Sequence, residues 1–229
     1  MRFDAESVKK LEQWQIYSML EGIVKSSREQ PQLNWEYALS SGQITSKLWI
    51  LEALKEIGVT SLGKVMVLGG WIGLLGHILL SERSLSIEKL RSFDIDPLCE
   101  EIADSINLSF VAREWKFKAS CADWHQLDYT ETKFSAFRRD GSLAQLTERF
   151  DTIINTCCEH IVDFDKWISK IPCDRLLILQ SNSSSLYEGH VNSHSSLAEF
   201  KAQVRLERVL FEGDLGSHVY DRWMLIGYR

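Results

Sequence analysis

The segment Lys64–Gly73 constrains the fold of this chain more than any other part of the sequence. An apolar run of strand-forming residues ends there in three glycines, Gly69, Gly70 and Gly73, and an apolar helical pattern follows at once. Glycine is favoured where the backbone turns sharply or lies close to a ligand, because it lacks a Cβ atom. A strand that turns on glycines into a helix is typical of α/β domains that bind adenosine-type cofactors.

Strand and helix patterns alternate after this turn. Repeated strand–helix units predict a parallel sheet covered on both faces. The last two strands, Val204–Glu212 and Tyr220–Tyr228, are joined by the short segment Gly213–Ser217, so we expect them to pair antiparallel. The prediction is an α/β fold with a doubly wound, mostly parallel seven-stranded Rossmann-like sheet that ends in an antiparallel β-hairpin. The other predicted strands are 64–69, 90–95, 115–120, 151–156 and 175–180, and the helices between them are 73–82, 97–107, 161–170 and 195–203.

Two amphipathic helices are predicted before the first strand, over Ala5–Glu29 and 43–57, and Gly58 ends the second. Residues 1–58 are therefore expected to form a helical cap or lid, and residues 59–229 the Rossmann-like cofactor-binding domain.

Composition limits the classes of function. The net charge is -6 and no basic stripe is present, so nucleic-acid binding is not indicated, although it is not excluded. The five cysteines are scattered and odd in number, which favours a reducing compartment. Residues 1–4 lack the apolar core of a signal peptide, and no segment approaches the ~20 apolar residues of a membrane span. We expect a soluble cytoplasmic protein without a membrane partner, and its oligomeric state stays open.

Acidic residues follow the second and third predicted strands. A Rossmann-like site needs a carboxylate at the end of the second strand for the ribose hydroxyls, about 20 residues after the glycine turn. Asp96 is the predicted ribose ligand, because it is predicted to be the last residue of that strand and so to lie at its carboxyl edge. Asp94 alternates to the same side and could also serve. The alternative is that Asp96 caps the helix that begins at Pro97.

These features together resemble the class I S-adenosylmethionine-dependent methyltransferases, over roughly residues 43–229. The resemblance implies S-adenosyl-L-methionine as the cofactor. It implies that Asp123 contacts the adenine amino group and that Trp124 covers the ring, although a capped loop with a core tryptophan explains both equally well. Lys47 is predicted to reach the methionine carboxylate of the cofactor or to extend into water.

The glycine turn departs from the family pattern at two positions. Val67 replaces the acidic residue that is usual on the first strand, and Trp71 stands where a middle glycine is common. Trp71 is therefore expected to reshape the cofactor pocket near the methionine portion.

Polar residues follow the fourth strand, at the edge where such folds carry their chemistry. Asn155, Glu159 and His160 are the predicted catalytic residues, with His160 as a base and Glu159 orienting it or holding an amine. The alternative is that Glu159 and His160 begin a helix. A zinc site formed with Cys157 and Cys158 is disfavoured, because adjacent cysteines rarely chelate one ion and no Cys-x-x-Cys motif exists elsewhere. No metal site is predicted.

A long polar loop follows the fifth strand, and loops of this length in compact domains are often functional. Asn182, His190 and Asn192 are the predicted substrate ligands, and a solvated loop is the equal alternative. The sequence therefore predicts a methyltransferase acting on an unidentified acceptor substrate. An S-adenosylmethionine-using transferase of the aminocarboxypropyl type and a noncatalytic methyltransferase-like binding domain are the alternatives.

Overall fold

The computed structural model describes residues 5–138, 140–185, 189–216 and 220–229, and side chains from residue 13 onward. Residues 1–4, to which the prediction about a signal peptide refers, lie outside these ranges. So do residues 186–188 of the polar loop and Ser217 of the predicted hairpin connection.

A seven-stranded sheet in the order β3-β2-β1-β6-β7-β9-β8 forms the centre of the molecule. β1, β2, β3, β6 and β7 are parallel to one another, whereas β9 is antiparallel to both β7 and β8. This arrangement confirms the predicted fold class, including the closing antiparallel hairpin. The strands are β1 Ser61–Leu68, β2 Ser86–Asp94, β3 Phe117–Cys121, β6 Thr152–Asn155, β7 Leu176–Asn182, β8 Arg208–Leu215 and β9 Arg222–Tyr228.

Helices cover both faces of the sheet because successive side chains of each central strand point to opposite faces. On β1, Val65 and Val67 pack into one core with α3 and α4, whereas Met66 and Leu68 pack into another with α7 and α8. The helices are α1 Ala5–Glu29, α2 Trp35–Ala38, α3 Ser41–Glu56, α4 Leu74–Ser81, α5 Pro97–Ile106, α6 Leu108–Val111, α7 Phe164–Ser169 and α8 Leu197–Val204.

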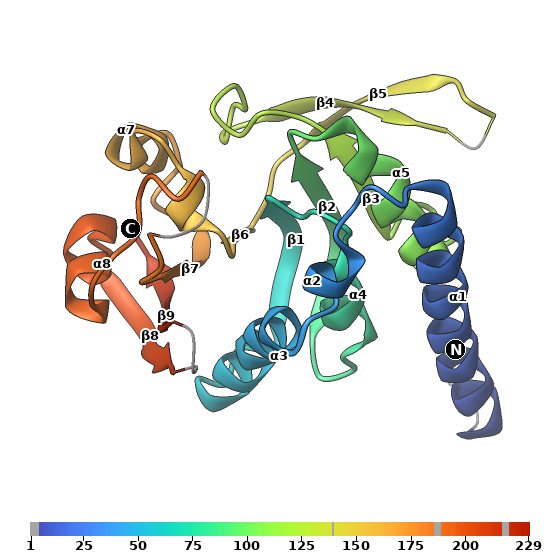
Figure 1. The fold of residues 1–229 in the computed structure, drawn as a ribbon, viewed down its shortest axis with the longest axis horizontal. Helices are drawn as coiled ribbons and strands as arrows, with labels where there is room; N and C mark the ends of the chain where they lie inside the picture. The colour runs from blue at the N-terminus through green and yellow to red at the C-terminus, as the bar shows by residue number, and fades with distance from the viewer. Residues whose placement is uncertain (1–4, 139, 186–188, 217–219) are drawn as a thin grey trace.

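The N-terminal helices lie at different places around this sheet. α1 has the predicted bounds and packs along α5 and α6, on the opposite side of the molecule from α7 and α8 (Figure 1). α3 packs against the first face of the sheet through Ile50, Ala53 and Leu54, which are buried. α3 is therefore part of the main core, whereas α1 is an outer layer.

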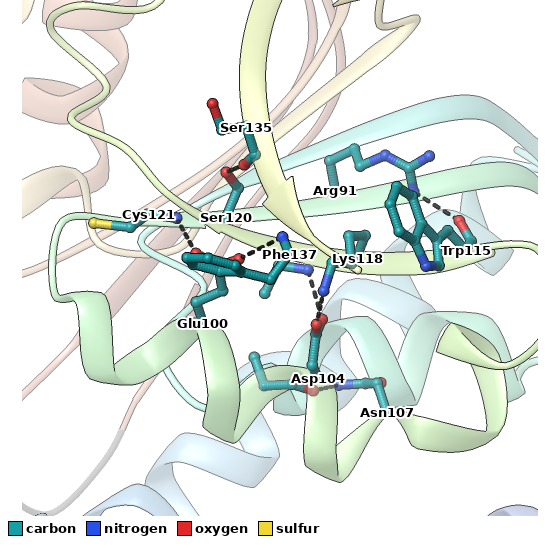
Figure 2. A network of polar contacts seen from close by, with 12 residues as sticks. Arg91, Glu100, Asp104, Asn107, Trp115, Lys118, Ser120, Cys121, Ser135 and Phe137 are labelled. Carbon is teal, nitrogen blue, oxygen red and sulfur yellow. Dashed lines mark hydrogen bonds and ion pairs between the residues drawn. The ribbon is translucent and has the colours of Figure 1, made fainter. Parts of the chain in front are cut away.

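A second, two-stranded sheet was not predicted. β4 (Thr132–Phe137) and β5 (Leu143–Glu148) form an antiparallel hairpin that extends across one end of the molecule (Figure 1). Figure 2 shows how the backbone of β4 is fastened to the main sheet and to α5. Glu100 accepts hydrogen bonds from the backbone N–H groups of Cys121 and Phe137, and the Ser120 hydroxyl donates to the carbonyl of Ser135.

Buried ion pairs complete the attachment of this hairpin and of β3. The guanidinium of Arg91, on β2, contacts the Glu148 carboxylate of β5 at 2.7 Å. It also donates to the carbonyl of Trp115 at 2.8 Å, as Figure 2 shows. Lys118 pairs with Asp104 in the same network. The hairpin is thus held by paired charges as well as by apolar contacts.

Several predicted bounds were wrong for local reasons. β3 begins at Phe117 because Glu114 and Trp115 have positive φ values of 50° and 55°, which no strand accommodates. β8 begins at Arg208, since α8 continues to Val204. The predicted helix 161–170 is shorter in the structure, where α7 spans only Phe164–Ser169, and a separate 3-10 turn, η1 (Cys158–His160), precedes it.

Candidate functional site

The glycine turn and the segment after β6 lie side by side at the carboxyl edge of the sheet. β1 and β6 are neighbours, with Leu68 paired to Asn155, but the chain leaves β1 toward β2 and leaves β6 toward β7. Such a topological switch point opens a crevice in which α/β proteins bind ligands. We call the ends of β1, β2 and β3 the cofactor half of this edge. The ends of β6 and β7, with the start of β9, are the acceptor half.

Close packing explains the glycines of the turn. A Cβ atom on Gly70 would lie 1.8 Å from the Ser92 hydroxyl, and one on Gly69 would lie 2.4 Å from Cys157 Sγ. Gly73 has a φ of 76° and begins α4, where a Cβ would overlap α5. The glycines therefore let β1, β2 and the segment after β6 approach one another closely.

Hydrogen bonds within the turn hold its shape. Gly70 N–H donates to the Phe93 carbonyl at 3.1 Å, Gly73 N–H to the Gly70 carbonyl at 2.9 Å, and Trp71 N–H to Asp94 Oδ2 at 2.8 Å. These three donors are already used inside the protein. The turn would thus serve a ligand by allowing close approach more than by donating these N–H groups.

Trp71 adopts the left-handed region with a φ of 47°, which is unusual for a residue other than glycine. Its ring lies 5.8 Å from that of Tyr37 on α2 and packs beside the cluster that contains Ile72. The indole is therefore directed toward the N-terminal helices, while the Trp71 backbone stays in the turn.

The end of β2 differs from the prediction. β2 ends at Asp94, and Asp96 is the N-cap of α5, accepting from Leu98 N–H at 2.9 Å. The predicted strand position of Asp96 was wrong because the chain leaves the sheet two residues earlier to begin the helix at Pro97. Asp94 is partly buried beside the glycine turn. Burial raises the pKa of Asp94, and the N–H groups of Asp96 and Trp71 counteract this by donating to its carboxylate.

Asp123 and Trp124 follow β3. Asp123 accepts from His125 N–H at 2.8 Å and from the Gln126 side chain at 3.2 Å, which are the contacts of a capped loop. The Trp124 ring lies 3.3 Å from the position of a Cβ on Gly69, so it faces the glycine turn. The cofactor half thus brings Asp94, Trp124 and the turn together.

The acceptor half contains buried polar groups. Asn155 is fully buried at the end of β6, where its Oδ1 accepts from Cys157 N–H at 2.8 Å. Its Nδ2 has no hydrogen-bond partner among the described residues. Glu159 is 3% exposed and accepts from Asn182 Nδ2 at 2.5 Å. Burial raises the pKa of Glu159, and the nearby Arg222 cation counteracts the rise.

Two predicted site histidines meet beside Glu159. The rings of His160 and His190 are edge to face, with centroids 4.6 Å apart. Asn192 instead fastens its loop, since its Nδ2 donates to the Cys158 carbonyl at 3.2 Å and to the Gln203 side chain at 3.1 Å. The structure therefore places Asn182 and His190 at the site and gives Asn192 a supporting position.

Arg222 was not predicted as a site residue. It is buried at the start of β9, opposite Asn182, and its guanidinium donates to the Thr156 carbonyl at 3.1 Å. Antiparallel pairing brings the beginning of β9 to the edge where β7 ends. The predicted antiparallel pair contained this information in principle, but the sequence did not indicate which strand β9 would join.

Lys47, on α3, completes the charges of the acceptor half. Burial, with the nearby Arg222 cation, lowers its pKa to about 8, whereas Cys157 and Glu159 act in the opposite direction. Its ammonium group donates to Gln43 Oε1 at 2.7 Å. A cavity of about 480 Å³ lies next to this cluster, lined by Ser41, Gly42, Thr45, Leu215, Gly216, Tyr220 and Arg222.

Solved structures with similar folds include methyltransferases and a [4+2]-cyclase. Magnesium protoporphyrin IX methyltransferase (ChlM) from Synechocystis PCC 6803 with bound SAM matches with a TM-score of 0.54 and 16% identity, over 82% of this chain and 79% of that chain. N-methyltransferase NodS from Bradyrhizobium japonicum WM9 in complex with S-adenosyl-L-homocysteine matches with a TM-score of 0.57 and 12% identity, over 90% and 98%. The [4+2]-cyclase SpnF matches with a TM-score of 0.58 and 10% identity, over 84% of each chain.

The chain has the class I S-adenosylmethionine-dependent methyltransferase fold, which confirms the resemblance inferred from the sequence. No protein-family model and no curated protein sequence matches it. Across the part of the chain that the structure describes, no helix combines the length and apolar character needed to cross a membrane.

Proposed function

We propose that this protein is an S-adenosylmethionine-dependent methyltransferase whose cofactor lies in the cofactor half and whose acceptor lies in the acceptor half. One observation carries the proposal. The glycine turn, Asp94 and Trp124 meet the polar segment Asn155–His160 at the topological switch point of the sheet. Neighbours of the same fold were solved with SAM or S-adenosyl-L-homocysteine bound, which supports this choice of cofactor.

The cofactor half fits an adenosine group. Asp94 has two carboxylate oxygens that each accept one backbone N–H and retain a lone pair for a ribose hydroxyl. Asp96 is the alternative ribose ligand, and it is exposed beside Asp94. Trp124 would cover the adenine ring, and Asp123 would accept from the adenine amino group.

The acceptor half would position the substrate. The cofactor, when bound, supplies an activated methyl group on its sulfonium, so the protein has mainly to align the acceptor and remove its proton. Glu159, His160 and His190 offer a carboxylate and two imidazoles for these tasks. Lys47 lies near Cys157, which packs against the glycine turn, so it would neutralise the methionine carboxylate of the cofactor where the two halves meet. The cavity beside Arg222 would admit the acceptor.

The predicted cap of residues 1–58 is proposed to act through α2 and the start of α3, because the rest of α3 belongs to the main core and α1 packs on α5 and α6. α2 contacts the glycine turn through Tyr37 and Trp71, and α3 carries Lys47. α2 and the start of α3 would therefore border the bound cofactor.

Transfer of the aminocarboxypropyl group is the second candidate. The observation that favours it is Trp71, whose backbone is in the left-handed region and which stands where a middle glycine is common in the family. The turn would therefore shape the pocket near the methionine portion of the cofactor differently. The similarity to a [4+2]-cyclase also shows that this fold hosts more than one kind of reaction. A noncatalytic binding domain is the remaining alternative.

Titration calorimetry with S-adenosylmethionine and S-adenosylhomocysteine tests the proposal. We expect both to bind, and Asp94→Asn to weaken both, whereas the exposed Asp128→Asn control leaves the affinity unchanged. If neither ligand binds the folded protein, the proposed function is wrong. Mass spectrometry of the nucleoside product then separates the two transfers, because methyl transfer leaves S-adenosylhomocysteine and aminocarboxypropyl transfer leaves methylthioadenosine.

A further inference from the structure

Three metal-ligating side chains meet in the acceptor half. Glu159, His160 and His190 place a carboxylate oxygen and two imidazole nitrogens within 4.8 Å of one another. The loop that carries His190 is tied to this point by the backbone, since Val191 N–H and Asn192 N–H both donate to the Glu159 carbonyl at 2.9 Å. The meeting of these side chains is therefore built into the fold of the loop.

Both imidazoles are oriented by backbone carbonyls. His160 Nδ1 lies 3.0 Å from the Gly189 carbonyl, and His190 Nδ1 lies 2.7 Å from the Ser184 carbonyl. A carbonyl can only accept, so Nδ1 carries the proton in each neutral ring and Nε2 carries the lone pair. Metal-binding histidines almost always have this arrangement, with one nitrogen on the ion and the other donating to a carbonyl or carboxylate.

The carboxylate is incompletely satisfied. Glu159 is 3% exposed and its Oε1 accepts from Asn182, but within the described part of the chain its Oε2 has no hydrogen-bond partner. An unsatisfied buried charged group is costly, so it usually has a counter-ion or a metal. Arg222 and Lys47 are the cations that face Glu159, and Arg222 donates to the Thr156 carbonyl. Oε2 therefore remains available to a ligand.

We propose that Glu159, His160 and His190 bind a divalent first-row transition cation such as Zn²⁺, Mn²⁺ or Fe²⁺. Two imidazoles and one carboxylate form an open site for such ions, with positions left for water or substrate. Donor atoms around a tetrahedral ion lie ~3.4 Å apart. Side-chain rotations that move the three ligand atoms by roughly an ångström would therefore bring them to this spacing. Mg²⁺ and Ca²⁺ prefer oxygen ligands and would bind more weakly.

This site differs from the cysteine site that the sequence disfavoured. Among the described residues, the side chains whose ligand atoms come close enough to hold one ion are Glu159, His160 and His190, and this group contains neither Cys157 nor Cys158. The cation would instead lie at the acceptor end of the proposed active site, where it would bind an oxygen or nitrogen of the acceptor. That use rests on the proposed function, but metal binding itself can be tested without cofactor.

The test uses the full-length protein after its metals have been removed with a chelator. Zn²⁺ binding is measured by competition against a chromophoric chelator, and Mn²⁺ binding by electron paramagnetic resonance. We expect one tight equivalent of each ion, with Zn²⁺ tighter than Mn²⁺ and with Mg²⁺ a poor competitor. No saturable binding of either ion, or equal competition by Mg²⁺, would overturn the proposal.

Variants locate the ion. His160→Ala, His190→Ala and Glu159→Gln are each expected to weaken Zn²⁺ binding by more than about 100-fold, and Asn182→Ala by about 10-fold through its hold on Glu159. His125→Gln, at a half-buried histidine in the turn that follows β3, is the matched control and should bind as the wild type does. Wild-type affinity in both His160→Ala and His190→Ala would disprove the assignment.

A measurement on the wild-type protein keeps the proposal testable if the variants do not fold. Cu²⁺ bound to the stripped protein should show two imidazole nitrogens in its pulsed electron paramagnetic resonance spectrum, and their absence would also disprove the assignment. Calorimetry with S-adenosylhomocysteine on the same protein separates the two proposals. Metal binding without cofactor binding rejects the proposed function alone, and cofactor binding without metal binding rejects the metal site alone.

Discussion

The two halves of the site edge balance their charges in different ways. In the cofactor half, the carboxylates of Asp94, Asp96 and Asp123 each accept a backbone N–H from the residue two positions further along the chain. Asp94 also accepts from Trp71 N–H in the glycine turn. In the acceptor half, Glu159 and Lys47 are largely removed from water and come from distant parts of the chain. The comparison shows that the carboxylates of the first half are held mainly by local turns, whereas the charges of the second half meet only because of the order of the strands.

Two buried glutamates, Glu148 and Glu159, illustrate this difference in how charges are balanced. Glu148 is the last residue of β5 and forms a direct ion pair with Arg91 of β2 at 2.7 Å. Glu159 lies in the acceptor half, where its Oε1 accepts from the neutral amide of Asn182 and no ion pair joins it to another described residue. The Oε2 atom lacks a hydrogen-bond partner in both glutamates within the described structure, so the ion pair is what separates them. One carboxylate stabilises the fold, and the other is available to a ligand.

The largest expected effect comes from removing the paired carboxylate. Glu148→Ala leaves the buried Arg91 guanidinium without its counter-ion, so the free energy of unfolding should fall by about 3–5 kcal/mol. Glu159→Gln keeps the shape of the side chain and removes an incompletely satisfied charge, so it should change stability by less than ~1 kcal/mol. Urea denaturation of the metal-free proteins measures both, and equal losses would show that the two glutamates do not differ in this way.

The next effect sharpens the assignment within the cofactor half. Asp94→Asn should weaken cofactor binding by roughly 10- to 100-fold, the cost of losing hydrogen bonds to a charged group. Asp96→Asn should leave it nearly unchanged, because asparagine caps a helix as well as aspartate does. Calorimetry with S-adenosylhomocysteine compares them. The reverse order of effects would restore Asp96 as the ribose ligand that the sequence favoured.

A smaller effect is expected from pH in the acceptor half. Lysine carries its charge below its pKa, and burial lowers the pKa of Lys47 to about 8. Raising the pH from ~7 to ~9 should therefore discharge Lys47 and weaken binding of the cofactor carboxylate, by at most about tenfold per pH unit. Lys47→Met should bind more weakly at pH 7 and lack this component. Parallel pH slopes for the two proteins, measured with a chelator present, would remove Lys47 from the site.

The smallest effect concerns the thiols beside the glycine turn. Burial raises the pKa of Cys157, so this thiol should stay protonated at neutral pH and resist iodoacetamide while the exposed Cys173 is labelled. Peptide mass spectrometry of the labelled native protein checks this. Rapid labelling of Cys157 would reveal a reactive thiol and would make a cysteine nucleophile worth testing.

The sequence supported most of the sheet but missed the β4–β5 hairpin. Its signals were present: Phe134 and Ala136 alternate on β4, Ala144 and Leu146 on β5, and Asp140 precedes a glycine in the turn. A search for alternating strand–helix units passes over a hairpin inserted between β3 and β6. Asp96 was wrongly placed on β2 for a related reason. The alternating pattern of the strand continues in the sequence beyond Asp94, where the chain leaves the sheet.

By itself the sequence determined the glycine turn after β1, the strand–helix alternation, the closing antiparallel hairpin and the bounds of α1. These features depend on residues close together in the chain, so local sterics and hydrophobic periodicity specify them. Only the tertiary structure decided that Lys47, Glu159, His190 and Arg222 share one edge. Their meeting depends on the order of the strands and on the antiparallel entry of β9, which are set by the packing of the whole sheet.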